Sequence, residues 1–273
     1  MDISRAVLGA VPTASVGSGD PIVLCAGVWP STGVESDFFV RSVLAPVQQL
    51  ATGRRLIVFN RRPNLSTGLT MGDLAAEYAD AIRSEFSAPV DLIGTSTGGS
   101  IAQQLAADHP GTVRRLVLIS TACRLGPPGR DLQAQVAARL RAGRIRSALS
   151  LVGASTVPPG LRTVTRGLTW AVAGRAITDS AAADLAATLE AEDGFDLARC
   201  ARPIAATTLI IAGGRDRFYS PEVFTETAAL IPESHLQLFP RRGHVTVARD
   251  RKARAMIAGF VTWTEPNETD GRS

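Results

Sequence analysis

The sequence has almost no lysine and few aromatic residues. Lys252 is the only lysine among 29 basic residues, so the net charge of +4 is carried by arginine. The arginines stand singly or in pairs beside acidic or apolar neighbours, whereas a nucleic-acid-binding chain clusters basic residues among aromatic ones. Aromatic residues make up only 5% of the chain. We interpret the arginine excess as a compositional bias, with a phosphate-binding surface as the alternative, and expect no nucleic-acid partner.

Cysteines and long apolar runs are also scarce. The three cysteines, Cys25, Cys123 and Cys200, are too far apart for a metal-binding or redox motif. A scattered, odd number of cysteines is typical of a reducing compartment. No apolar run approaches the about 18 residues of a membrane-spanning helix, and the apolar stretch in residues 1–10 is too short for a secretory signal. These absences predict a cytoplasmic protein with no membrane span and no metal site.

Short runs rich in Val, Ile and Leu alternate with helical patterns along most of the 273 residues. This alternation indicates an α/β fold, with a parallel sheet covered by helices on both faces. Thr70 with Asp73, and Ser220 with Pro221, are typical of helix starts. Residues 11–20 are expected to form an antiparallel hairpin at one sheet edge. Strands are predicted at residues 22–25, 56–59, 90–93, 116–119, 208–212 and 236–239.

The alternation stops between residues 124 and 203, where the chain is rich in Ala, Arg and Leu. We expect helices over 131–151, 161–177 and 180–192, the last capped by Asp179 or Ser180. Such an insertion predicts a helical cap, an ordinary helical extension being the alternative. The expected organisation is a discontinuous core at 1–123 and 204–265, a cap at 124–203 and a flexible tail at 266–273.

The sharpest local pattern is the sequence GTSTGG at residues 94–99, between a predicted strand and a helical run. Glycines two positions from Ser96 remove bulk from a tight strand-to-helix turn, which would expose the Ser96 hydroxyl. The amide of Thr97, at the helix N-terminus, would face developing negative charge. A tight or phosphate-binding turn is the alternative, although the absence of a following lysine excludes a P-loop. We predict Ser96 as a nucleophile.

A serine nucleophile needs a base, and the chain has only three histidines. His109 is expected at a surface helix end and His235 at the start of a strand. His244 follows the last predicted strand, after Gly243, where the sites of open parallel sheets form. We therefore predict His244 as the base, with a solvated loop histidine as the alternative.

A carboxylate must orient the histidine. Asp216 follows the strand before that of His244, in the sequence GGRD at residues 213–216, and is the predicted acid. A turn aspartate paired with a neighbouring arginine is the alternative. Asp91 lies at the start of its strand, and Asp193 and Asp196 precede a strand, so these three fit less well. The order Ser, Asp, His is that of α/β-hydrolases.

These motifs resemble the α/β-hydrolase superfamily over roughly residues 20 to 265. The sequence NRRP at 60–63 is similar to a family stretch that often reads Asp-Arg-Gly. The resemblance implies a mostly parallel eight-stranded sheet with the site at its carboxyl edge and a cap after the strand at 116–119. The family's first catalytic loop often begins His-Gly, whereas here Ala26 takes the place of the histidine. The second oxyanion donor would be the Val28 amide, with Trp29 as the alternative.

The resemblance implies a serine hydrolase that acts on an ester, thioester or lactone through an acyl-enzyme, without a cofactor or metal. Serine in place of aspartate argues against opening of epoxides or displacement of halide. Perhydrolases, acyl transferases, lyases and carbon–carbon hydrolases share such a site, and a non-catalytic binding protein is a further alternative. Trp29 and Trp170 are predicted to contact a small apolar or mixed substrate. Further apolar cap residues are Leu149, Leu151, Val152, Leu168 and Val172.

Overall fold

The computed structural model describes residues 2–155, 159–173 and 177–263. The predicted tail at 266–273 lies outside these residues, as does part of the helix predicted at 161–177. None of the described helices is long and apolar enough to cross a bilayer.

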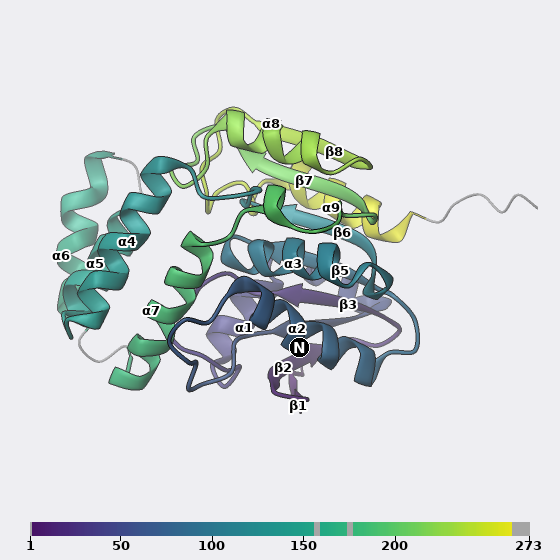
Figure 1. The fold of residues 1–273 in the computed structure, drawn as a ribbon, viewed down its shortest axis with the longest axis horizontal. Coiled ribbons are helices and arrows are strands. Elements are labelled where there is room, and N and C mark those ends of the chain that lie inside the picture. The colour runs from purple at the N-terminus through teal and green to yellow at the C-terminus, as the bar shows by residue number, and fades with distance from the viewer. Residues whose placement is uncertain (1, 156–158, 174–176, 264–273) are drawn as a thin grey trace, which may run out of the picture.

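A mixed, mostly parallel eight-stranded sheet forms the centre of the described chain (Figure 1). Its strand order is β1-β2-β4-β3-β5-β6-β7-β8. Neighbours from β4 to β8 pair in parallel, and β1 and β2 pair antiparallel at one edge. The strands are β1 (Ser4–Leu8), β2 (Val11–Val16), β3 (Asp20–Cys25), β4 (Arg54–Phe59), β5 (Val90–Thr95), β6 (Val113–Ile119), β7 (Thr207–Gly213) and β8 (Ser234–Phe239).

All six predicted strands are confirmed, each inside the bounds of an observed strand. Their apolar runs are continuous because helices cover both faces of the sheet, so successive side chains are buried whichever face they point to. Leu92 and Ile93 of β5 are 0% and 2% exposed. The uninterrupted runs therefore identified parallel strands correctly.

The position predicted for the edge hairpin is wrong. The hairpin joins β1 to β2, with Leu8 opposite Val11, and residues 11–20 contain only its second strand and the start of β3. The chain turns at Gly9, whose φ of 59° is easily reached by glycine. The side chains of β1 are exposed along most of the strand, so no buried run marks it in the sequence.

Helices cover both faces of the sheet (Figure 1). Ile57 and Phe59 of β4 join a core that includes buried side chains of α2, α3 and α8. Leu56 and Val58 of the same strand join a second core with side chains of α1 and α9. The helices are α1 (Asp37–Leu44), α2 (Met71–Glu85), α3 (Thr97–Asp108), α4 (Pro127–Arg141), α5 (Ile145–Ser155), α6 (Arg162–Ala173), α7 (Asp179–Asp193), α8 (Pro221–Leu230) and α9 (Arg251–Thr262). Short 3-10 helices are η1 (Gln48–Thr52), η2 (Pro110–Thr112), η3 (Pro159–Leu161) and η4 (Leu197–Arg199).

Two predicted helix starts are confirmed. The Thr70 hydroxyl accepts from the Asp73 amide (3.1 Å), and the Asp73 carboxylate accepts from the Thr70 amide (2.8 Å), which forms a capping box at α2. Ser220 precedes α8, although its side chain makes no capping hydrogen bond.

The predicted cap of α7 is wrong by one residue. Thr178 caps this helix, because its hydroxyl accepts from the Ala181 amide (3.2 Å). Asp179 is the first helical residue, where a carboxylate interacts favourably with the helix dipole. Thr and Asp both suit the start of a helix, so the sequence does not distinguish the two positions.

Between β6 and β7 the described residues form α4, α5, α6 and α7, and no strand, as predicted. In Figure 1, α4, α5 and α6 lie at the end of the molecule away from α9, and α7 lies between them and the sheet. These helices enclose a small core of their own that includes Val136, Leu140, Leu149 and Leu185. The side chain of Val28, from the loop after β3, packs against this core, so the insertion contacts the carboxyl edge of the sheet.

Asp91 lies at the opposite, amino edge of the sheet, as predicted. Its fully buried carboxylate accepts two hydrogen bonds from Arg114 (2.9 and 2.7 Å) and one from Arg54 (2.6 Å). The hydrogen bond to Asp91 raises the pKa of Arg114. Because two guanidinium groups compensate the buried charge, Asp91 ties three strands together away from Ser96.

Candidate active site

Ser96 lies at the sharp turn between β5 and α3. Its φ of 51° and ψ of −129° are unusual for a residue with a side chain, and such a conformation costs about 1 to 3 kcal/mol. The turn is fixed on both sides, since the Ser96 amide donates to the Ile119 carbonyl (2.9 Å) and its carbonyl accepts from the Gly99 amide (2.7 Å). The predicted nucleophile therefore stands at the carboxyl edge of the central strand.

The glycines around Ser96 are required by close packing. A Cβ on Gly94 would lie 2.6 Å from the Gly99 Cα. A Cβ on Gly98 would clash with the carbonyl oxygens of Cys25 and Ala26, at the end of β3. The same close approach brings the loop after β3 beside the serine, where a Cβ on Gly27 would lie 3.3 Å from the Ser96 Cβ.

His244 follows β8 and reaches the serine from across the sheet. Its Nε2 lies 3.0 Å from Ser96 Oγ. The Ser120 hydroxyl donates to the His244 carbonyl (2.6 Å), which fixes the loop backbone. The rings of Phe218 and Tyr219 lie 4.6 and 6.0 Å from the imidazole centroid, the second one stacked. Sequence reasoning missed these three supporting residues, because each acts only through a long-range contact.

Asp216 is the hydrogen-bond partner of the second imidazole nitrogen of His244. Its Oδ2 lies 2.8 Å from His244 Nδ1, and its side chain is fully buried. Its Oδ1 accepts from the amides of Phe218 (2.9 Å) and Tyr219 (3.4 Å). These two amides occupy Oδ1, so Oδ2 can accept from Nδ1–H and leave Nε2 free to accept from Ser96.

The amides of Thr97 and Val28 are free to bind a developing negative charge. Within the described ranges, neither amide donates a hydrogen bond to a carbonyl or a side chain. Thr97 is the first residue of α3, so its amide points out of the helix N-terminus. Val28 lies one residue beyond Gly27, beside the serine.

The two predicted substrate-binding tryptophans lie in different environments. Trp29 is half-buried in the loop after β3, with its ring 5.9 and 5.7 Å from those of Phe38 and Phe39. Trp170 of α6 is 52% exposed and lies under the guanidinium of Arg146, 5.2 Å from its centroid. A substrate contact by Trp29 stays a prediction, and the outward position of Trp170 gives no support to the role predicted for it.

Glu192 of α7 connects the helical insertion to the serine turn, a contact that sequence reasoning missed. This carboxylate is 1% exposed and accepts four hydrogen bonds. The donors are the hydroxyls of Thr97 (2.6 Å), Ser100 (3.0 Å) and Tyr219 (3.2 Å) and the amide of Gln133 (2.8 Å). Burial raises the pKa of Tyr219 well above its ordinary value, so its hydroxyl stays protonated and donates.

Replacing Glu192 with leucine is expected to destabilise the fold by about 3 to 5 kcal/mol, because several buried donors lose their acceptor. Glutamine retains one acceptor and should lose less. Urea unfolding of the variants measures the difference. The matched control is Glu190→Leu on the same helix, where the glutamate is partly exposed and pairs only with Arg141, and it should change stability by under about 1 kcal/mol. Equal losses at the two positions would contradict the role of Glu192.

Arg61 supports the loop that carries Val28. It lies in the stretch 60–63 after β4, is 2% exposed, and donates from Nη2 to the Trp29 carbonyl (2.9 Å). Burial lowers the pKa of Arg61, and the negative charges of Asp184 and Glu192 act in the opposite direction. The stretch that resembles the family's Asp-Arg-Gly thus holds the loop that carries Val28 in place.

The remaining histidines and cysteines lie apart from this site. His109 ends α3, where its Nδ1 lies 3.3 Å from an Arg83 nitrogen, and His235 is exposed on β8. Burial raises the pKa of the Cys25 thiol strongly, which keeps it protonated and poorly nucleophilic. No cluster of three His, Cys, Asp or Glu suited to a metal ion occurs in the part of the chain that the structure describes.

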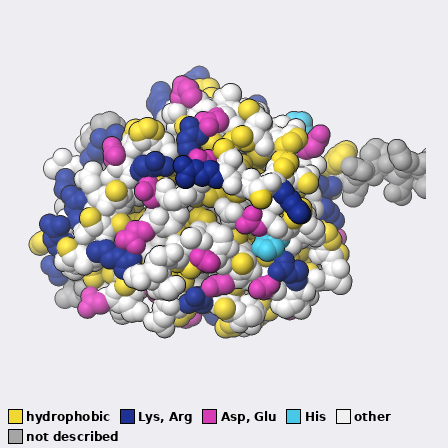
Figure 2. Space-filling model, in the orientation of Figure 1, with side chains coloured by type: hydrophobic (Ala, Val, Ile, Leu, Met, Phe, Trp, Pro, Cys, Tyr) yellow, Lys and Arg dark blue, Asp and Glu magenta, His cyan; other side chains and the backbone are white. Residues whose placement is uncertain are grey.

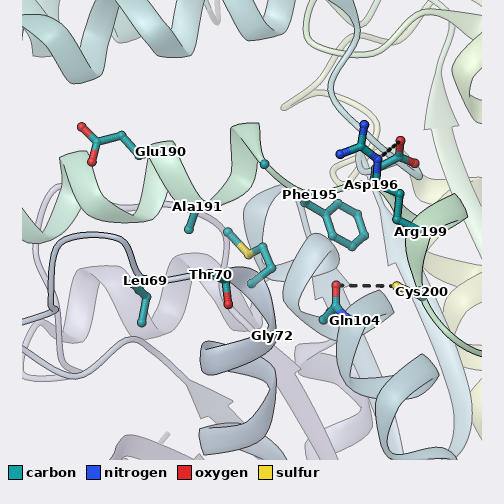
Figure 3. A pocket seen from close by; sticks show the side chains of 12 residues that line it. Leu69, Thr70, Gly72, Gln104, Glu190, Ala191, Phe195, Asp196, Arg199 and Cys200 are labelled. Atoms are coloured by element: carbon teal, nitrogen blue, oxygen red, sulfur yellow. Dashed lines mark hydrogen bonds and ion pairs between the residues drawn. The ribbon is translucent and has the colours of Figure 1, made fainter.

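A pocket of about 340 Å³ opens elsewhere, between the start of α2, α3 and the end of α7 (Figure 3). Thr70, Gln104 and Phe195 line it, and none of its lining residues is Ser96, Asp216, His244 or an oxyanion donor. Two of its lining residues contact each other, since the Cys200 thiol donates to the Gln104 side-chain oxygen (3.6 Å). Figure 3 marks this contact with a dashed line. We therefore keep this pocket separate from the candidate active site.

Solved structures with the same fold include two hydrolases. The enol-lactonase from Burkholderia xenovorans superimposes with a TM-score of 0.74 at 20% identity, covering 95% of this chain and 100% of that one. An esterase from Exiguobacterium antarcticum gives a TM-score of 0.69 at 21% identity, covering 93% and 96%. At these identities the similarity shows the fold.

Among curated proteins, a pimeloyl-[acyl-carrier protein] methyl ester esterase from Neisseria meningitidis is 47% identical over 53 residues. The match covers 19% of this chain and 20% of that protein, so the chain spans only about a fifth of the length of this relative.

The model of the Alpha/beta hydrolase family matches residues 22–255, a range that includes the serine turn, Asp216 and His244. The eight-stranded sheet with its helical insertion after β6 agrees with that match. The chain therefore belongs to the alpha/beta hydrolase family.

Proposed function

We propose that this hydrolase cleaves an ester, thioester or lactone of a small apolar or mixed substrate through a covalent acyl-enzyme. The observation that carries the proposal is the row of hydrogen bonds from Ser96 Oγ to His244 Nε2 (3.0 Å) and from His244 Nδ1 to Asp216 Oδ2 (2.8 Å). A nucleophile, a base and an orienting acid arranged in this way perform acyl transfer on several unrelated folds.

In the acylation step, Ser96 Oγ attacks the substrate carbonyl carbon while its proton moves to His244 Nε2. The carbonyl electrons move onto the oxygen, and the amides of Thr97 and Val28 stabilise the resulting oxyanion. The tetrahedral intermediate then collapses, the bond to the leaving alcohol or thiol breaks, and that group takes the proton from Nε2. Asp216 stays ionised throughout and stabilises the imidazolium.

In the deacylation step, water replaces the leaving group. His244 Nε2 takes a proton from water, the hydroxide oxygen attacks the acyl carbon, and the same two amides hold the oxyanion. Collapse breaks the bond to Ser96 Oγ, which recovers the proton from Nε2, and the carboxylic acid leaves.

The surroundings of the serine support an apolar acyl or alcohol group. Val28 packs against the small core of the insertion, to which the half-buried Leu151 and Val152 of α5 also contribute. Leu168 and Trp170 point outward and are not part of this proposal. The side chain of Val172 lies outside the described residues. The fold similarity to an enol-lactonase and an esterase is consistent with ester or lactone substrates.

We also propose that residues 124–203 act as a cap over the serine. Two of its helices reach the site directly, because Glu192 of α7 and Gln133 of α4 belong to the hydrogen-bond group that includes Thr97. The cap would then supply the wall of the substrate pocket and exclude water from it.

A fluorophosphonate probe is expected to label the folded protein at one site, because an activated serine reacts with it. Peptide mapping by mass spectrometry should identify Ser96. An acyl-enzyme also predicts an initial burst of p-nitrophenol from a short-chain p-nitrophenyl ester, equal to the enzyme concentration, when deacylation is slower than acylation.

Heat-denatured protein is the control and should remain unlabelled. Label on Ser100, whose hydroxyl donates to Glu192, or no label on protein shown to be folded by circular dichroism, would contradict the proposed mechanism.

A further inference from the structure

Helix α6 presents apolar side chains to the outside of the molecule. Leu161, at the end of η3, and Val164 and Leu168 of α6 are 56%, 62% and 65% exposed. Their spacing of three and four residues places them in one stripe along the helix. Trp170, 52% exposed, lies on the other flank of the outer surface.

The side of α6 that faces the molecule is polar instead. Arg162, Thr165 and Thr169 are half-buried at the same helical spacing. Thr169 packs so closely on α5 that a Cβ on Gly153 would lie 2.6 Å from its hydroxyl oxygen. A surface helix of a globular protein normally buries its apolar stripe and exposes its polar face. The orientation of α6 is the reverse, so its outer stripe, formed by Leu161, Val164 and Leu168, is available to a partner.

The sequence around this stripe contains arginine and no acidic residue. The sequence from residue 132 to residue 178 contains seven arginines and no aspartate or glutamate. Arg144, Arg146 and Arg166 are exposed, and Arg146 lies over the ring of Trp170. In Figure 2 the left end of the molecule, where α5 and α6 lie in Figure 1, carries dark blue and yellow side chains.

The charge decides between the possible partners. A second copy of this chain would bring two arginine-rich caps together, and like charges across an interface oppose association. A membrane with anionic lipids offers the complementary charge and an apolar layer. Amphipathic helices that lie in the membrane interface combine apolar residues such as Leu and Trp with Arg. On the outer surface of α6 the apolar stripe lies on one flank, and Trp170, with Arg146 over its ring, lies on the other.

We propose that the outer surface of α6 is a docking surface for anionic lipid membranes, with the apolar stripe on one flank and Trp170, Arg146 and Arg166 on the other. Leu161, Val164 and Leu168 enter the boundary between headgroups and acyl chains, Trp170 lies at headgroup level, and Arg146 and Arg166 contact the lipid phosphates. This inference is independent of the proposed catalytic mechanism, since none of these residues is Ser96, His244 or Asp216.

Co-sedimentation with vesicles tests the proposal. The full chain is expected to bind vesicles of phosphatidylcholine mixed with phosphatidylglycerol and not those of phosphatidylcholine alone, and added salt should weaken binding. Leu168→Ser should reduce the partition coefficient about tenfold through lost apolar burial. The double variant Arg146→Gln/Arg166→Gln should reduce it about 30-fold, at roughly fivefold for each charge.

Matched variants on other surfaces serve as controls. Val7→Ser removes an apolar side chain that is 65% exposed on β1, and Arg202→Gln/Arg251→Gln removes two exposed arginines elsewhere. Both should bind vesicles as the unmodified chain does. Thermal unfolding of each variant confirms that it is folded.

Three results would overturn the proposal. The first is absence of binding to anionic vesicles, whether or not an acidic protein binds the same surface. The second is equal binding to both kinds of vesicle. The third is self-association of the unmodified chain that Leu168→Ser abolishes, since a second copy would then be the partner of the stripe.

Discussion

Ser96→Ala is expected to lower kcat/KM for an ester substrate by about 10⁶-fold, the loss seen when the nucleophile of such a catalytic group is removed. The variant retains the free amides of Thr97 and Val28, so a residual rate of about 10³- to 10⁴-fold above water is expected. Hydrolysis of p-nitrophenyl butyrate, followed spectrophotometrically with highly purified variant, measures both values.

The matched control for this change is Ser84→Ala on α2. The Ser84 hydroxyl donates only to the Ala81 carbonyl within the same helix, so the rate should stay within about twofold of the original, as for most surface substitutions. If Ser96→Ala retained more than about a tenth of the activity, another group would be the nucleophile.

Asp216→Asn is expected to lower kcat at neutral pH by about 10⁴-fold with little change in fold. The asparagine amide can donate to His244 Nδ1, which moves the ring proton to Nε2 and prevents it from accepting the Ser96 proton. The amides of Phe218 and Tyr219 can still donate to the remaining side-chain oxygen. The measurement is kcat against KM for the same ester, and KM should change by less than about threefold.

Asp193→Asn is the control, because Asp193 was a weaker candidate for the acid on the basis of sequence. In the structure it ends α7 and pairs with Arg130 at 3.0 Å, both groups being partly exposed. We expect its kcat to stay within about twofold. A comparable loss in the two variants would mean that Asp216 has no special role.

The strands were predictable because burial on both faces leaves a local mark, an uninterrupted apolar run, as in β5 and β7. Ser96 was predictable for a similar reason, since the strained turn requires glycines within three residues of it. The role proposed for His244 followed from the small number of histidines in the chain. The role proposed for Asp216 followed from its place in the order Ser, Asp, His. The structure brings these side chains within 3.0 and 2.8 Å of their partners.

Features that depend on distant contacts left no such mark. Glu192 receives donors from residues 97, 100, 133 and 219, and no local spacing connects them. The edge strand β1 was missed because it is exposed and depends on pairing with β2. The cap of α7 was placed one residue late because neighbouring Thr and Asp suit the same position.

The sequence by itself determined the fold class, the serine turn and the order of the three predicted catalytic residues, because these follow from local backbone requirements and hydrophobic runs. Only the tertiary structure decided which side of each helix in the insertion faces the rest of the molecule. The spacing of Leu161, Val164 and Leu168 defines a stripe but not its direction, and the stripe lies outward because Thr169 packs on Gly153. The direction in which such a stripe points depends on the surface that the helix packs against. The spacing of residues along the helix carries no information about that surface.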